Sequence, residues 1–495
     1  GWISSKGDAI VNVLKGVFYN RNTLAAEKSL TLSALNGVEN FKNISAAGGD
    51  LTITTQRHVT NNNNSNMVGD NVTITAVNDI NNRGNIVGDS DLTVKTNGNL
   101  NNNLTMRGEG DVSISANSIN NNNATLKANG SMTLATAANV GNNRGSITAG
   151  NGDISIVSAK GNIDNYSGTI LSAGAVNIAG GALNNDYGQI AGVNDIDLTL
   201  TGNFDSYRGS VLFETGEVTL KGNAIDNNYG SIAGKNVTVD VKPTVYNNTA
   251  MMAASQQLSV TSAGNIENRY GNNFVSQLGS YFGITGDAGG MVGTEGVSLS
   301  AQNVYNNYSS IIAEKGPLSL IAKSTLDNTW GMLVSGADAI VKAAGVFYNN
   351  YATTWSAGNL DVTTSTLYNA SNGSMANNTA TGVIASDKKL TLNVDNSFTN
   401  YGWISSKDTL NVNVLKGVLY NRNTISADNA LAINAQNGVD NFQDIVAGTS
   451  VNIDTQRHVT NNAKSNILAQ NIAINAVNDI NNRGNIVGDY TLTAK

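Results

Sequence analysis

The chain has 495 residues, of which 40% are hydrophobic and only 13% are charged, and its formal net charge is −7 at pH 7. The hydrophobic fraction excludes an intrinsically disordered low-complexity chain, and so mild a negative charge argues against nucleic acid as a partner. The absence of cysteine excludes disulfides, zinc–cysteine sites and thiol nucleophiles.

A period of about 20 residues runs along the chain. Each period holds an apolar residue followed by a polar pair, usually Asn-Asn or Asp-Asn, then a glycine, and then a short strand in which apolar and polar residues alternate. The apolar position is occupied by Ile80, Leu100, Ile119, Ile163, Leu183, Phe204 and Ile225. Strands are expected at residues 51–54, 72–75, 92–94, 112–115 and 237–240. Each repeat is therefore predicted to contain two or three short strands separated by Gly/Asn/Asp turns.

Such units cannot be free hairpins, because each strand has only one or two apolar residues to bury. Stacked in parallel, they place Ile, Leu, Val and Ala inward on every coil, and each coil pairs its backbone with the next. We therefore expect an all-β fold, a right-handed, three-sided parallel β-helix with coils of about 20 residues. Asparagine suits the turns, and in register its side chains can stack as an amide ladder along the axis.

The β-helix is predicted to be one domain that consists of residues 1–269, 293–369 and 385–495. Two insertions interrupt it. The insertion at 270–292 contains Tyr270, and its residues Phe274, Leu278 and either Tyr281 or Phe282 have helical spacing. A second, polar insertion covers residues 370–384. Insertions in solenoids map to loops and often carry binding, so the first is a candidate binding loop; tolerated slippage of the repeat is the alternative.

An aromatic residue recurs at what we interpret as one corner of successive coils, where neighbouring rings would stack. The positions are Tyr166, Tyr187, Tyr207 and Tyr229, and the series resumes at Tyr308, Trp330 and Tyr351. We interpret them as a structural ladder; a sugar-binding stripe is the alternative.

The sequence offers no catalytic set. Its two histidines, His58 and His458, lie in strand-like segments and are interpreted as coil-face residues. Asp195 and Asp197 lie on one side of a predicted strand, as in β-helix enzymes that cleave carbohydrate, but such enzymes need further acids in a cleft. No phosphate-binding loop or calcium-binding repeat is present. We therefore predict that the protein is not an enzyme and that it has no cofactor and no metal site.

Residues 402–495 repeat residues 1–95, with roughly six aligned positions in ten identical. Repetition at this scale is a way to build a long protein. The chain starts at Gly1 and breaks off within a repeat at Lys495, so we expect any export signal, anchor or terminal effector domain to lie outside it.

The repeated units resemble a known family. Asn-Asn-Arg-Gly-Asn-Ile-Val-Gly at 81–88, Asn-Asp-Tyr-Gly-Gln-Ile-Ala-Gly at 185–192 and Asn-Asn-Tyr-Gly-Ser-Ile-Ala-Gly at 227–234 are similar to the haemagglutinin repeats. These repeats occur in filamentous-haemagglutinin-like exoproteins, including contact-dependent inhibition effectors of Gram-negative bacteria. The resemblance covers almost the whole chain apart from the two insertions.

The resemblance implies export through an outer-membrane transporter of the two-partner (type V) route and display at the cell surface as a filament for adhesion or toxin delivery. The expected function is the structural shaft of a secreted or cell-surface adhesin. Its expected partners are the transporter, a receptor or glycan on a host or neighbouring cell, and further copies of itself through lateral association. A β-helix carbohydrate-active enzyme or polysaccharide-binding protein is the alternative.

Overall fold

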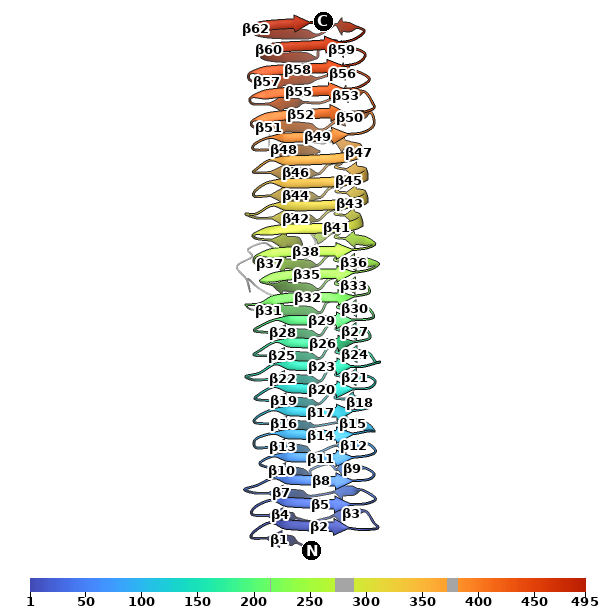
Figure 1. Cartoon of the computed structure of the whole chain (residues 1–495), viewed down its shortest axis with the longest axis vertical. Coiled ribbons are helices and arrows are strands. Elements are labelled where there is room, and N and C mark those ends of the chain that lie inside the picture. Colours follow the sequence, from blue (N-terminus) through green and yellow to red (C-terminus); the bar gives the residue numbers. More distant parts are fainter. Residues whose placement is uncertain (214, 272–288, 372–381) are drawn as a thin grey trace. The chain divides into compact units, whose positions relative to one another are not determined.

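The computed structural model describes residues 1–213, 215–271, 289–371 and 382–495. The elements of these residues are all β-strands, and they form two compact units, Gly1–Lys235 and Asn236–Lys495. Within each unit the strands run parallel and follow one another as stacked coils (Figure 1). The predicted all-β solenoid with coils of about 20 residues is confirmed.

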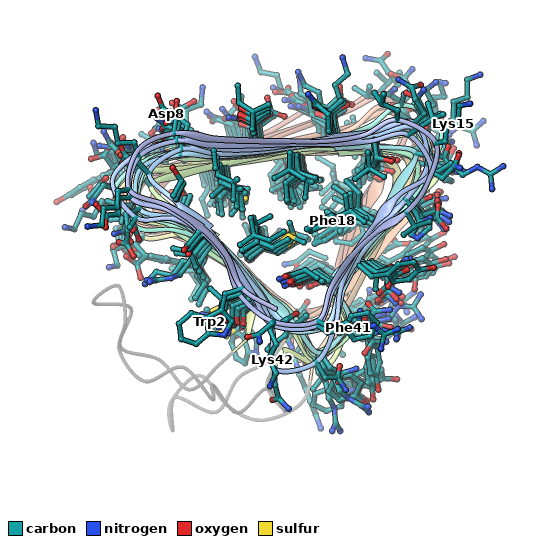
Figure 2. All side chains as sticks on the ribbon, turned by 90° about the horizontal axis from the view of Figure 1, so that it is seen from below. Trp2, Asp8, Lys15, Phe18, Phe41 and Lys42 are labelled. Atoms are coloured by element: carbon teal, nitrogen blue, oxygen red, sulfur yellow. The ribbon has the colours of Figure 1, made fainter. Side chains whose placement is uncertain are left out.

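Each coil of the first unit has three sides (Figure 2). We call them side A, side B and side C in chain order, and we name the corners AB, BC and CA after the sides they join. In the first coil these sides are β1 (Ile3–Ser5), β2 (Ala9–Val13) and β3 (Phe18–Asn20). Asp8 lies at corner AB and Lys15 at corner BC, whereas Lys42 of the second coil lies at corner CA.

The remaining strands of the first unit follow the same order. Side A continues with β4 (Leu24–Ala26), β7 (Asn43–Ala46), β10 (Asn66–Gly69), β13 (Asn85–Gly88), β16 (Thr105–Gly108), β19 (Thr125–Ala128), β22 (Ser146–Ala149), β25 (Thr169–Ser172), β28 (Gln189–Gly192), β31 (Ser210–Phe213) and β34 (Ser231–Gly234). Side B continues with β5 (Leu30–Ala34), β8 (Leu51–Thr55), β11 (Val72–Ala76), β14 (Leu92–Thr96), β17 (Val112–Ala116), β20 (Met132–Thr136), β23 (Ile154–Ser158), β26 (Val176–Gly180), β29 (Ile196–Leu200) and β32 (Glu217–Gly222). Side C continues with β6 (Val38–Asn40), β9 (Val59–Asn61), β12 (Ile80–Asn82), β15 (Asn99–Asn102), β18 (Ser118–Asn120), β21 (Val140–Gly141), β24 (Ile163–Asp164), β27 (Leu183–Asn184), β30 (Phe204–Asp205) and β33 (Ile225–Asp226).

In the second unit several strands run on from one side to the next. Side A comprises β37 (Met251–Ala254), β40 (Gly290–Gly293), β42 (Ser310–Ala313), β44 (Met332–Ser335), β46 (Thr353–Ser356), β48 (Val383–Ser386), β51 (Trp403–Ser406), β54 (Ile425–Ala427) and β57 (Asp444–Ala447). Side B comprises β35 (Asn236–Val241), β38 (Gln257–Ser262), β49 (Leu390–Val394), β52 (Thr409–Val414), β55 (Ala430–Ala435) and β58 (Ser450–Thr455). Side C comprises β36 (Thr244–Tyr246), β39 (Asn265–Glu267), β50 (Phe398–Tyr401), β53 (Leu419–Asn421), β56 (Val439–Asn441), β59 (Val459–Asn461) and β61 (Ile480–Asn482). Sides B and C are continuous in β41 (Gly296–Tyr305), β43 (Leu318–Asp327), β45 (Ala339–Tyr348) and β47 (Leu360–Ala370), and sides A and B in β60 (Asn466–Ala476) and β62 (Asn485–Ala494).

The core of each unit is a set of apolar columns parallel to the axis. Ile74 of β11 pairs with Ile53 of β8 and with Val94 of β14, and all three side chains are buried. Burying one such side chain contributes roughly 1.5–3 kcal/mol, and the alternation along each strand points its polar neighbours outward. The period of about 20 residues therefore keeps the same chemical type at the same place in every coil.

A ladder of asparagine side chains, buried except at its last member Asn482, runs beside this core at the end of side C. Each Nδ2 donates to Oδ1 of the ladder residue one coil later, so every bond points the same way along the axis. In the first unit it joins Asn20, Asn40, Asn61, Asn82, Asn102, Asn121, Asn142, Asn165 and Asn185 at 2.7–2.9 Å. In the second unit it joins Asn247, Asn268, Asn306, Asn328, Asn349, Asn369, Asn400, Asn421, Asn441, Asn461 and Asn482 at 2.7–3.1 Å.

The bounds of the two predicted insertions need correction. Residues 290–292 belong to β40, Ala370 belongs to β47, and residues 383–384 belong to β48. Each of these strands pairs in register with the neighbouring coil, for example Met291 of β40 with Met252 of β37. The solenoid strands therefore extend further into the two predicted insertions than their composition indicated, because the apolar residues there keep the spacing of the repeat.

Candidate functional site

The predicted aromatic residues lie at corner CA, directly after the asparagine ladder. Here the chain turns through one residue with positive φ, and in several coils this residue is aromatic, such as Tyr187 with φ 56° and Tyr229 with φ 58°. A left-handed backbone costs a residue with a side chain about 1–2 kcal/mol. Where this residue is aromatic, contacts between the rings of successive coils offset part of the backbone penalty.

In the first unit the rings form an edge-to-face series. The centroid distances are 5.8 Å from Tyr166 to Tyr187, 5.7 Å from Tyr187 to Tyr207 and 5.4 Å from Tyr207 to Tyr229, with interplanar angles of 64–69°. The rings alternate because Tyr166 and Tyr207 directly follow the ladder residue, whereas Tyr187 and Tyr229 come one position later. All four rings lie at the one predicted corner, where they occupy two alternating backbone positions.

In the second unit the aromatic residues all occupy the left-handed position, and their rings are nearly parallel. Tyr270 and Tyr308 are 5.8 Å apart at 11°, Tyr308 and Trp330 are 6.1 Å apart at 11°, and Trp330 and Tyr351 are 4.7 Å apart at 21°. Because the rings start from the same backbone position in each coil, they take the same orientation and stack in parallel, whereas the alternating positions of the first unit give edge-to-face contacts. Tyr348 and Tyr368, which the sequence interpretation missed, form a second stack on side C at 5.0 Å and 8°.

This stacking bears on sugar binding. A pyranose ring packs against the open face of an aromatic side chain, but Tyr308 and Trp330 turn both ring faces toward neighbouring rings in the stack. Tyr308 is 45% and Trp330 is 39% exposed, so mainly the ring edges face solvent. At Tyr308 and Trp330 the geometry is therefore that of rings stacked in a ladder.

Four carboxylates accompany the tyrosines of the first unit. Asp164, Asp205 and Asp226 lie on side C, and Asp186 lies in the corner next to them. Burial raises the pKa of Asp186, and the charges of Asp226 and Asp164 raise it further, although a hydrogen bond from the Tyr207 backbone N–H opposes this. Burial also raises the pKa of Asp205, with contributions from Asp186 and Asp226.

Asp195 and Asp197 lie in different parts of their coil. Asp195 lies at corner AB, outside β29, where its Oδ1 accepts a hydrogen bond from the Glu217 backbone N–H at 2.9 Å. Asp197 lies on the outer face of β29 and accepts a hydrogen bond from the Thr199 hydroxyl at 2.8 Å. The residues paired with Asp197 in the adjacent strands are Asn177 and Thr219, so those positions add no acid to it.

The two histidines have equivalent surroundings in the duplicated segments. His58 Nε2 lies 2.9 Å from Glu39 Oε1, and His458 Nε2 lies 3.2 Å from Asp440 Oδ1. Each ring covers a glycine with φ 128°, Gly37 or Gly438, and leaves no room there for a Cβ atom. Both histidines are thus coil-face residues held by a carboxylate of the preceding coil.

The candidate binding loop can be followed only at its start. Tyr270 lies at corner CA as the first ring of the stack with Tyr308, and Phe274, Leu278, Tyr281 and Phe282 lie outside the described residues. Within the described ranges there is no group of three or more His, Cys, Asp or Glu residues placed to hold a metal ion. Nor do those ranges include a helix with the length and hydrophobicity needed to span a bilayer.

The comparisons with known proteins agree with this architecture. The model of the haemagglutinin repeat matches residues 12–62, 46–104, 107–165, 167–206, 205–269, 283–328, 313–371 and 355–441. Neither the curated proteins nor the solved structures include a match. Because the matched segments cover most of the chain, from residue 12 to residue 441, the chain belongs to the haemagglutinin-repeat family.

Proposed function

We propose that this chain is part of the structural shaft of a long secreted or cell-surface adhesin, which projects a binding or effector region from a Gram-negative cell. The observation that carries the proposal is the coil-to-coil register of each unit, in which strands, apolar core and asparagine ladder all continue from one coil to the next. Each coil adds about 4.8 Å along the axis, so added repeats convert directly into length.

Export belongs to the same proposal. Members of the haemagglutinin-repeat family are usually secreted or exposed at the surface, and a two-partner outer-membrane transporter would deliver this chain. The lack of cysteine supports export, since no disulfide can form during passage through an oxidising compartment. A receptor or glycan on a host or neighbouring cell would be contacted by other parts of the full protein or by the insertions.

Electron microscopy of the purified full-length protein tests the shaft. We expect thin, unbranched rods whose length grows with the number of repeats, and a variant lacking one whole coil, residues 105–124, should be shorter by about 5 Å with its β-sheet circular dichroism unchanged. Compact particles would contradict the proposal. Secretion of the chain with and without a co-expressed two-partner transporter tests the export route separately.

The alternative of a carbohydrate-active enzyme has no specific observation in its favour. Asp195 accepts a backbone hydrogen bond, and the residues paired with Asp197 in the adjacent strands, Asn177 and Thr219, are neutral. Assays on polysaccharides with the Asp197→Asn variant as control decide the question, and turnover lost in that variant would reinstate the enzyme.

A further inference from the structure

Charges are segregated between two corners of the first unit. In coils between residues 47 and 153, corner AB carries acids and, among its described residues, no lysine or arginine. Its exposed acids include Asp50, Asp70, Asp89, Asp91, Glu109 and Asp111. We call this set the acidic edge.

The opposite border of side A has the reverse charge. Between residues 20 and 145, the described residues of corner CA include no aspartate or glutamate. Its exposed cations are Arg21, Lys42, Arg83 and Arg144. We call this set the basic edge. Over these coils side A therefore forms a strip with an acidic edge on one border and a basic edge on the other; Figure 2 shows the two borders at the corners marked by Asp8 and Lys42.

The two edges are not consumed by ion pairs within the chain. The one ion pair recorded for these acids and cations of the described coils joins Glu109 to Arg107, which lies between the edges on side A. Instead, acids of corner AB brace the backbone: Asp91 Oδ1 accepts from the Asp111 N–H at 2.8 Å, and Asp111 Oδ1 accepts from the Ser131 N–H at 2.7 Å. Such bonds hold the carboxylates at fixed positions along the axis.

We propose that side A of the first unit is a lateral pairing surface for a second copy of this chain. Two copies facing each other across side A can be related by a two-fold axis along the solenoid or by one across it. The first relation, with parallel chains, exchanges the borders and sets each acidic edge against the partner's basic edge. The second, with antiparallel chains, sets acid against acid and base against base. Charge complementarity thus selects parallel pairing.

The free energy of association is limited by the solvent exposure of the paired charges. A single exposed ion pair contributes about 0–1 kcal/mol, so stable association requires several pairs repeated along both edges. Salt must weaken the association, because charges separated by more than about 10 Å are screened at 0.1 M. The inference goes beyond the shaft function, since a chain that failed to pair could still act as a spacer.

Sedimentation of the full chain tests the pairing. At low ionic strength we expect a twofold rise in weight-average mass that is lost in 0.5 M NaCl. The base-reversed variant Arg21→Glu/Lys42→Glu/Arg83→Glu and the acid-reversed variant Asp50→Lys/Asp70→Lys/Asp89→Lys should each remain monomeric, whereas an equimolar mixture of the two should associate. A β-sheet circular dichroism spectrum equal to that of the parent shows that both variants are folded. The control Lys15→Glu/Arg57→Glu/Lys160→Glu, at corner BC, should pair like the parent.

Cross-linking tests the orientation. The chain has no cysteine, so single cysteines can be placed on the outer face of side A as Ser45→Cys in β7 or Thr148→Cys in β22. In parallel pairs each variant forms a disulfide with itself. Disulfides that form only when the two variants are mixed would overturn the parallel arrangement. A parent chain that stays monomeric at low salt, or pairing that survives both reversals, would overturn the proposal as a whole.

Discussion

Asn102 donates from Nδ2 to Oδ1 of Asn121 at 2.8 Å, and both side chains are completely buried. The same Nδ2 also donates to the backbone carbonyl of Thr125 at 2.9 Å, while Oδ1 of Asn102 accepts from Asn82. An amide meets this demand because it offers two donor hydrogens and an acceptor in one plane. Aspartate lacks the donors and leucine lacks both, so the ladder explains why asparagine recurs at this position in all but one of the coils from Asn20 to Asn227.

Replacing Asn102 by alanine should therefore destabilise the first unit. The change removes three hydrogen bonds and leaves the donor of Asn82 and the acceptor of Asn121 unpaired, which should cost about 3 kcal/mol. Hydrogen exchange of β15 and β18 measures the loss locally, as suits a solenoid that unfolds in parts. The control Asn101→Ala removes one hydrogen bond, from Nδ2 to Asn81 Oδ1, at a partly exposed position, and should cost about 1 kcal/mol or less. Equal losses would contradict the role of the ladder.

Ser206 replaces asparagine in the ladder, and restoring the amide should stabilise its coil. Asn185 donates to Ser206 Oγ at 3.2 Å, a longer bond than the amide rungs before it. We expect Ser206→Asn to raise the free energy of unfolding by about 1 kcal/mol, the value of one added hydrogen bond. Ser206→Ala is the matched control and should lower it. A decrease with asparagine would show that the coil cannot accept the larger side chain.

The stacked aromatic residues of the second unit should be energetically coupled. A double-mutant cycle with Tyr308→Ala and Trp330→Ala should give a coupling of about 0.5–1.5 kcal/mol, measured by urea unfolding. The pair Tyr401→Ala and Trp330→Ala, which has no ring contact in the described structure, should be additive. Additivity of Tyr308 and Trp330 would mean that the stack forms only because the backbone repeats.

The period of the sequence was sufficient to predict the solenoid and its strands. Ile53, Ile74 and Val94 recur at the interval of one coil, and a one-residue slip would place polar residues in the core. The ring geometry could not be predicted from spacing alone, because it depends on whether an aromatic residue comes one or two positions after the ladder asparagine. Counting from Asn165 to Tyr166 and from Asn185 to Tyr187 would have revealed the alternation.

Some features of the candidate site could not be predicted for a similar reason, because they depend on where each turn falls in the coil. The pair Asp195 and Asp197 looked equivalent in sequence, but Asp195 ends a corner and Asp197 lies within β29, which only the position of the turn decides. The asparagine ladder was predicted, whereas the uniform direction of its bonds depends on the stacking of whole coils. Charge segregation also emerges only when corners are assigned.

Gly37 should resist substitution. Its φ of 128° disfavours any side chain, and a Cβ atom would lie 2.6 Å from His58 Cε1. Gly37→Ala should therefore displace the histidine from Glu39 and cost about 1–3 kcal/mol. Gly7→Ala is the control, since its Cβ meets no atom within 4 Å. If both alanine variants melt at the parent temperature, the histidine–glycine contact has no structural role.

The carboxylates beside the tyrosines of the first unit should make its stability depend on pH. Burial and neighbouring acids raise the pKa of Asp186 and Asp205 above the usual 3.8 of an aspartate. A carboxyl whose pKa is raised by folding favours the folded state while it is protonated, so its contribution is present below the unfolded pKa and is lost as pH rises through the folded pKa. Between about pH 4 and pH 7, the coils around β27 and β30 should therefore become less protected against hydrogen exchange.

Asp205→Asn should remove part of this loss and protect those coils at pH 7, because it removes the charge and its repulsion of Asp186. Asp89→Asn, at exposed corner AB, controls for the net charge. A parent chain whose protection in these coils increases from pH 4 to pH 7 relative to Asp205→Asn would show that the carboxylates are better solvated than their burial indicates.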